Sequence, residues 1–167
     1  MSKKMMSPNT RIDWITDPAY DPANPSAALF TPATNISCAI VAGYTLNPTR
    51  SNVDTSKSIC DAGTVENPGT YNYEGSATFF REGDLEDTTS DYARAFEFFK
   101  QRGQEGYLVR RTGMRSGVAV EAGQIVSSFK FQNDNPKDVV GDDDAPIQWT
   151  TKFNPQGRME LFKTVKA

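Results

Sequence analysis

Hydrophobic and polar residues alternate along much of the chain between residues 71 and 166, and the alternation is clearest at residues 124–132. One face of this run holds Ile125, Ser127, Phe129 and Phe131, and the other holds Gln124, Val126, Ser128, Lys130 and Gln132. Because successive side chains of a strand point to opposite sides of a sheet, this pattern is typical of a β-strand with one dry face and one wet face. We therefore expect a mainly β protein.

The same reasoning predicts further strands at residues 35–44, 70–81, 106–112, 118–132, 147–153 and 158–165. In the run at 70–81 the polar face holds Asn72, Glu74, Ser76 and Thr78. The last two strands are expected to form a hairpin around residues 154–157, because Pro155 presets its φ angle and Gly157 permits a positive one. A polar loop is expected at residues 133–145, and a longer one at residues 45–69.

One helix is predicted over about residues 90–102. Its apolar stripe, at positions i, i+3, i+4 and i+7, consists of Tyr92, Ala95, Phe96 and Phe99. Thr89 or Ser90 can cap the start, and Gly103 can end the helix. A helix with a single apolar stripe covers one face of a sheet, so these four residues are expected to form a helix–sheet core.

The first 33 residues contain five prolines and few apolar residues, which nearly excludes regular structure apart from a short extended piece at residues 11–16. We interpret residues 1–33 as an extended N-terminal arm and residues 34–167 as the folded domain. The apolar anchors of the arm are Ile12, Trp14, Leu29 and Phe30. Such an arm can lie over its own domain or over a neighbouring subunit, and the sequence does not separate the two.

The composition of the chain excludes several classes of function. The 167 residues carry a net charge of −3, which argues against wrapping nucleic acid, and contain no apolar run long enough to span a membrane. The chain has no histidine and two cysteines, so we expect no catalytic residues, no metal site and no cofactor. The first residues lack the apolar stretch of a secretory signal, so we expect a cytoplasmic protein in which Cys38 and Cys60 are free, packed thiols.

Three charged groups have alternative interpretations. Asp142, Asp143 and Asp144 could bind a divalent cation, but they lack the ligand spacing of a calcium loop, and a solvated acidic loop is favoured. The basic residues Arg110, Arg111 and Arg115 fit salt bridges better than a phosphate site. The acidic residues at 82–87 could act as paired catalytic acids, but they precede a helix and no pattern there indicates a pocket. A solvated loop is again favoured.

The order of these elements resembles that of the major tail protein, or tail tube protein, of long-tailed, siphovirus-like bacteriophages. Three local stretches of sequence also resemble this family: residues 40–48 (IVAGYTLNP), 69–75 (GTYNYEG) and 107–113 (YLVRRTG). The resemblance covers about residues 35–166. It implies a β-sandwich or barrel-like fold with one flanking helix, a long N-terminal arm and a long loop.

The resemblance also implies a function. Six subunits would form a ring, and stacked rings would form the tail tube, a conduit for genome delivery. The arm residues would then contact a neighbouring subunit, and a ring-stacking loop would include Leu46, Asn47, Arg50, Val53, Asp54 and Ile59. The lumen would be lined by Asn72, Glu74, Ser76, Thr78, Gln124, Ser128, Lys130 and Gln132, with an acid near Lys130.

The implied partners are other copies of the chain, the tape measure protein and DNA in the lumen, and the tail terminator and tail tip proteins. No membrane is involved. The implied location is the virion tail, assembled in the host cytoplasm. A stand-alone β-sandwich that binds a carbohydrate or a partner protein remains the alternative function, and an enzyme is a distant third.

Overall fold

The computed structural model describes residues 8–55, 57, 59–60, 67–84, 86–142 and 144–167. The described residues form one antiparallel sheet of seven strands, with β8 joined to β9 beside the path β1-β6-β7-β9-β5-β2. Its strands are β1 (Thr10–Ile15), β2 (Thr45–Thr49), β5 (Asn72–Phe80), β6 (Glu105–Thr112), β7 (Ile125–Asn133), β8 (Lys137–Val139) and β9 (Gln148–Thr164). A separate two-stranded ribbon pairs β3 (Val53–Asp54) with β4 (Asn67–Pro68). The prediction of a mainly β fold is confirmed.

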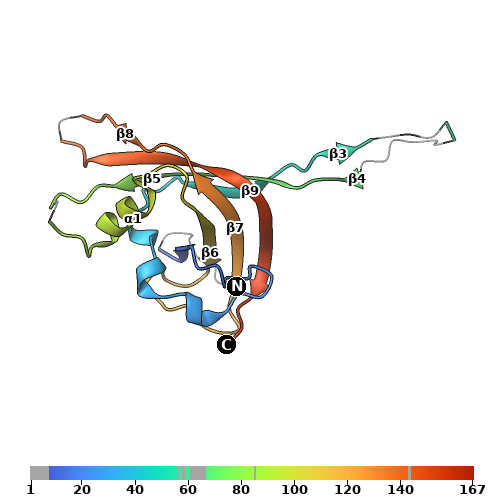
Figure 1. Cartoon of the computed structure of the whole chain (residues 1–167), viewed down its shortest axis with the longest axis horizontal. Coiled ribbons are helices and arrows are strands. Elements are labelled where there is room, and N and C mark those ends of the chain that lie inside the picture. The colour runs from blue at the N-terminus through green and yellow to red at the C-terminus, as the bar shows by residue number, and fades with distance from the viewer. Residues whose placement is uncertain (1–7, 56, 58, 61–66, 85, 143) are drawn as a thin grey trace, which may run out of the picture.

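The sheet curls until its two edge strands approach each other (Figure 1). Ile12 of β1 and Leu46 of β2 line the same small internal cavity. Arg110 of β6 donates a hydrogen bond to the carbonyl oxygen of Leu46 at 2.7 Å. The result is a barrel-like body with an inner face and an outer face, consistent with the sandwich or barrel-like fold expected from the sequence.

The inner face encloses an aromatic core that is closed by α1 (Asp91–Phe99). Phe99 of the helix lies fully buried, with its ring centroid 4.9 Å from that of Trp14 and 5.1 Å from that of Phe153. Ala95 is also buried and Phe96 packs edge-on against Trp149, so the predicted helix and its core stripe are confirmed at these positions. Tyr92 lies at the rim and contacts Phe80.

The N-terminal segment forms a second core on the outer face. β1 is an edge strand of the sheet and pairs with β6. The following residues cross the outside of β6 and β7, where the short 3-10 turn η1 (Ala27–Leu29) packs. Two further turns return to the inner side: η2 (Pro32–Thr34) lies beside β1, and η3 (Ser37–Ala39) contacts β1 and α1. Tyr20 and Phe30 from this segment pack with Val109, Val126 and Val165. The predicted boundary at residue 33 therefore lies inside one packed unit.

Two predicted elements are wrong. Residues 154–157 do not form a hairpin: β9 runs without interruption from Gln148 to Thr164, pairing first with β5 and then with β7. The Tyr73 hydroxyl explains this, because it accepts hydrogen bonds from the amides of Gln156 and Arg158 and donates to the Lys130 carbonyl. Pro155 and Gly157 thus bend the strand between two partners instead of reversing it.

Residues 35–44 do not form the predicted first core strand either. They contain η3 and two isolated bridges, from Asn35 to Asp13 and from Ile40 to Phe79, and the strand begins only at Thr45. The side chain of Asn35 accepts a hydrogen bond from the amide of Ser37 at 3.0 Å, and such local side-chain bonds compete with strand pairing. Likewise β7 begins at Ile125 instead of residue 118, and β8 occupies part of the predicted 133–145 loop.

Candidate assembly surfaces

The four predicted arm anchors lie against their own chain. Ile12 and Trp14 belong to the inner core, Phe30 belongs to the outer core, and Leu29 is half-buried beside it. The reason is strand pairing: β1 adds to β6 over six residue pairs and directs alternate side chains inward. This placement differs from the expected contact with a neighbouring subunit.

A buried ion pair fastens β1 beneath the covering segment. The Arg11 guanidinium contacts the Asp13 carboxylate through two hydrogen bonds of 2.7 and 2.8 Å, and both side chains are almost fully buried. Arg11 also donates to the carbonyl oxygens of Thr31 and Val118, while the Thr34 hydroxyl donates to Asp13. No sequence pattern indicated this pair, because charges two residues apart on a strand are common on exposed faces.

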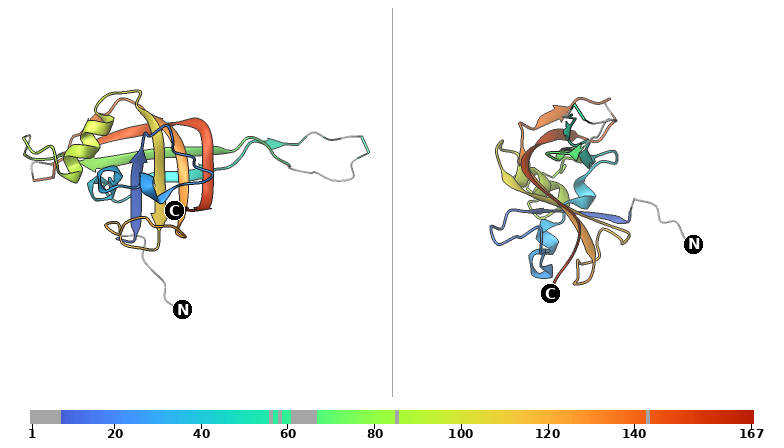
Figure 2. Two further views of the ribbon diagram at one scale, coloured as in Figure 1. Left: turned by 60° about the horizontal axis from the view of Figure 1, so that its bottom comes forward. Right: turned by 90° about the vertical axis from the view of Figure 1, so that its right-hand side faces the viewer.

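The predicted stacking loop is in large part a projecting ribbon, here called the extension: β3, β4, the described residues between them, and the residues that join them to β2 and β5. Figures 1 and 2 show it reaching away from the body, on the side opposite α1. The amide of Gly69 donates to the Asn52 carbonyl at 2.7 Å, and the amide of Asn52 donates to the Thr70 carbonyl. Its side chains are largely exposed, including those of Asn47 at its base and of Arg50, Val53, Asp54 and Ile59. Positions 56, 58 and 61–66 of the predicted loop lie outside the described residues.

Leu46 differs from the other predicted stacking residues. It lies in β2, opposite Gly75 of β5, and its side chain is buried in the inner core. It is therefore unavailable at the surface of the subunit.

The central strands of the sheet present a polar outer face. Asn72, Glu74, Ser76 and Thr78 lie on β5, and Lys130 and Gln132 lie on β7; all of these are half-buried or exposed. The Lys130 ammonium lies 2.5 Å from a Glu105 carboxylate oxygen, and this hydrogen bond raises the pKa of Lys130. The expected acid beside Lys130 is thus confirmed, and the pair leaves this face without a lone cation at that point.

Two residues of the predicted lumen set are placed differently. Ser128 is fully buried, and its hydroxyl lies 2.7 Å from that of Tyr20, whose pKa is raised by burial. The cause is the N-terminal segment, which covers this stretch of β7. Gln124 lies just before β7 and accepts a hydrogen bond from Arg111 at 3.0 Å. The wet face predicted from alternation is therefore covered at Val126 and Ser128 and uncovered at Lys130 and Gln132.

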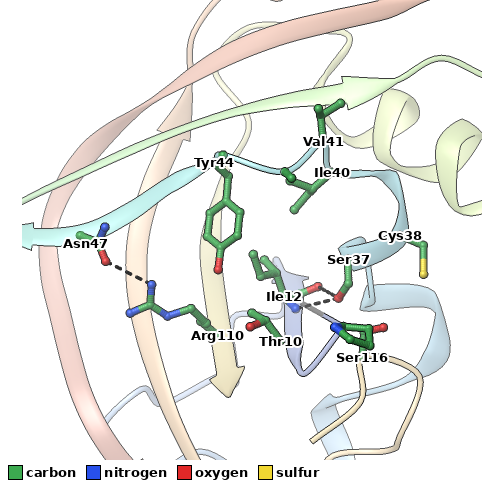
Figure 3. Close-up of a pocket in the computed structure, with 13 residues that line it drawn as sticks. Thr10, Ile12, Ser37, Cys38, Ile40, Val41, Tyr44, Asn47, Arg110 and Ser116 are labelled. Atoms are coloured by element: carbon green, nitrogen blue, oxygen red, sulfur yellow. Dashed lines mark hydrogen bonds between the residues drawn. The ribbon is translucent and has the colours of Figure 1, made fainter. Parts of the chain in front are cut away.

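A pocket of about 560 Å³ lies between the edges of the curled sheet (Figure 3). Its walls include Ile12 of β1, Tyr44 and Asn47 near β2, and Arg110 of β6. The Arg110 guanidinium is already bonded to the Leu46 carbonyl and to Asn47. The lining contains one aromatic ring, that of Tyr44, and no carboxylate.

Two of the basic residues predicted to form salt bridges, Arg110 and Arg111, bind carbonyl groups instead. Arg111 is buried and donates to the backbone oxygens of Val118, Ala119 and Arg115, and to the side chain of Gln124. Burial lowers its pKa from the usual value. Cys38 and Cys60 are exposed, which differs from the packed thiols expected from the sequence. In the described part of the chain no group of three or more metal-binding side chains occurs, and no helix is long and apolar enough to cross a membrane.

Sequence reasoning also passed over Phe162. The signal was present, because Leu161 and Phe162 are adjacent apolar residues that break the alternation of the last strand. In the structure Leu161 is half-buried, whereas Phe162 is 75% exposed.

Comparison with known proteins finds a matching family model. A family model described as "Phage tail tube protein" matches residues 1–167. A comparison with curated proteins finds no match.

Proposed function

The chain belongs to the phage tail tube protein family, and we propose that it assembles as stacked hexameric rings into a tube through which the phage genome passes. The family is a structural one, and its place is the virion tail. The match over residues 1–167 is the observation that carries the proposal. We further propose that assembly takes place in the host cytoplasm, before the tail joins the particle.

The polar outer face of β5, β7 and β9 suits the wall of a DNA channel. A channel that conducts DNA must not hold phosphates, and phosphate binding requires unbalanced Lys and Arg. Lys130 is paired with Glu105, and on the same face the exposed residue Glu74 of β5 offsets the exposed residue Lys152 of β9. We propose that Asn72, Glu74, Ser76, Thr78, Lys130 and Gln132 face the lumen. Ser128 is left out of this set because Tyr20 covers it.

The extension suits contact between rings. Two paired strands with exposed side chains on both faces bury little surface within one chain, and isolated hairpins are marginally stable in water. A neighbouring ring would cover Val53 and Ile59, which are exposed in the single chain. The tape measure protein and DNA would occupy the lumen, and tail terminator and tip proteins would close the two ends of the tube.

Negative-stain electron microscopy of the concentrated protein tests the proposal. The expected result is rings or tubes with six-fold end views. A monomer at every concentration, together with binding of a sugar or a partner protein, would instead favour the stand-alone binding module.

A further inference from the structure

Phe162 combines two unfavourable features. Among the described residues other than glycine it alone has a positive φ, of 55°, and its ring is 75% exposed. Residues with a Cβ atom rarely adopt this left-handed conformation, and a bulky residue there is a backbone outlier. The strained conformation is held in place, because the Ser127 hydroxyl accepts a hydrogen bond from the Phe162 amide at 3.2 Å where the β7–β9 register shifts.

Strain at an exposed aromatic residue brings no gain within the single chain, which suggests a use outside it. Phe162 stands beside a groove of about 490 Å³, whose walls include Met114 and Ile125. Both of these are exposed as well, so the bulge places three large apolar side chains at one site. The groove is also lined by Arg110 and Arg111, and its lining holds no acidic residue. We call these apolar residues and the groove the Phe162 surface.

The hairpin between β8 and β9 has the opposite charge and a similar apolar content. Val139, Val140 and Ile147 are exposed there, Val140 almost completely. The described acids around them are Asp138, Asp142 and Asp144. An apolar, acidic hairpin is the chemical complement of an apolar groove with arginines in its walls.

The two surfaces cannot meet within one subunit. The hairpin lies just before the start of β9 at Gln148, and Phe162 lies near the other end of that strand. Figure 1 shows the β8 end of the hairpin and the C-terminal end of β9 on opposite sides of the body. Only a second copy of the chain can bring the hairpin of one subunit to the Phe162 surface of another.

We propose that the β8–β9 hairpin of each subunit docks on the Phe162 surface of the next one. The inference rests on the proposed function and deepens it, because it names the contact that joins neighbouring copies. A contact between two different surfaces is heterologous, and it generates rings when the rotation closes. Apolar contact of Ile147 and Val140 with Phe162, Ile125 and Met114 would supply the attraction. The guanidinium groups of Arg110 and Arg111 are bonded within their own subunit, so they would act on the hairpin's aspartates through their positive charge and not through direct ion pairs.

Two substitutions, each disabling one surface, test the proposal. Phe162→Asp removes the aromatic ring at a position where aspartate tolerates the left-handed conformation better than phenylalanine. Ile147→Asp places a charge in the middle of the hairpin's apolar patch. Each variant should melt at or near the temperature of the unmodified protein, and each should raise the concentration needed for assembly at least tenfold. Val118→Ser, at another exposed apolar residue, is the matched control and should assemble normally.

Mixing the two variants gives the decisive result. The intact hairpin of Phe162→Asp can dock on the intact groove of Ile147→Asp, but the remaining two surfaces of that pair are both disabled. An equimolar mixture should therefore form a 1:1 heterodimer by light scattering or native mass spectrometry, whereas each variant alone stays monomeric.

Other outcomes overturn the inference. If Phe162→Asp folds and assembles like the unmodified protein, the Phe162 surface is not an assembly contact, and the proposed function stands. If the mixture stays monomeric, the hairpin is not the partner of that surface. If the unmodified protein never assembles, the inference and the proposed function both fail.

Discussion

The body of the subunit and the extension differ in what their strands bury. In the body, the inner face packs on α1 and the N-terminal segment covers part of the outer face, so that Ile36, Phe79, Phe129 and Phe131 have no exposed surface. In the extension, two short strands pair by backbone hydrogen bonds, and side chains such as Val53 and Ile59 remain exposed. One chain thus packs the core of its body by itself, whereas its extension has almost no core of its own and exposes side chains that a neighbour can cover.

The largest effect on stability is expected at the buried ion pair of the body. Asp13→Ala leaves the Arg11 guanidinium buried without its carboxylate, which should lower the free energy of unfolding by about 3–5 kcal/mol. Asp21→Ala is the matched control, because Asp21 pairs with Arg158 at 3.0 Å on the surface, where solvent screens the pair and its loss should cost far less. Urea unfolding of both variants measures the difference. Equal losses would mean that the N-terminal segment does not seal the body.

A pair of isoleucines compares the two regions directly. Ile36 is fully buried in the inner core and Ile59 is fully exposed in the extension. Ile36→Ala should cost about 2–5 kcal/mol of stability, because it removes buried methyl groups and leaves a cavity. Ile59→Ala should change the stability of the single subunit by less than about 0.5 kcal/mol, yet weaken assembly. A large loss of subunit stability in Ile59→Ala would show that the extension packs on its own body.

The smallest effect is expected from pH, at the loop before α1. The pKa of Glu82 lies below its usual value, mainly because its carboxylate accepts a 2.5 Å hydrogen bond from the Ser90 hydroxyl. A carboxyl whose pKa is lower in the folded state stabilises the fold above its unfolded pKa and loses that contribution as the pH falls through the folded value. Stability should therefore fall slightly on acidification below about pH 4.5, the usual range of Glu.

Glu82→Gln should reduce the loss of stability on acidification, without changing how stability depends on pH above that range. Asp87, whose pKa is lowered by hydrogen bonds from Thr89, retains its own contribution and serves as an internal control. The unfolding free energy of both proteins, measured at several pH values, tests this. If the unfolding free energy of Glu82→Gln falls with pH as steeply as that of the unmodified protein, the Glu82–Ser90 hydrogen bond does not hold the loop.

The sequence predicted those elements whose hydrophobic pattern continues over several turns or residues and whose first and last residues are distinctive. The helix was predicted because Tyr92, Ala95, Phe96 and Phe99 follow its period and Ser90 caps it; the structure confirms the cap through the Ala93 amide. The hairpin at 154–157 was predicted from a local turn signal. It failed because a distant hydroxyl, that of Tyr73, satisfies the backbone there. Such contacts have no local sequence pattern.

The same limit applies to the surfaces. Alternation placed Ser128 and Lys130 on one face, and in the structure both do lie on the outer face of β7. It could not show that Tyr20, more than 100 residues earlier, covers Ser128 and leaves Lys130 open. Tertiary cover, rather than strand period, therefore decides which polar residues of this sheet can reach a channel.

Hydrogen exchange of the subunit and of the assembled tube tests most directly the claim that the core of the body packs within one chain and that the extension is completed by a neighbour. Amides of β6 and β7 should be equally protected in both states. Those of Asn52 and Gly69, which are bonded only within the extension, should exchange quickly in the subunit and become protected in the tube. Equal protection of these two amides in both states would contradict the account.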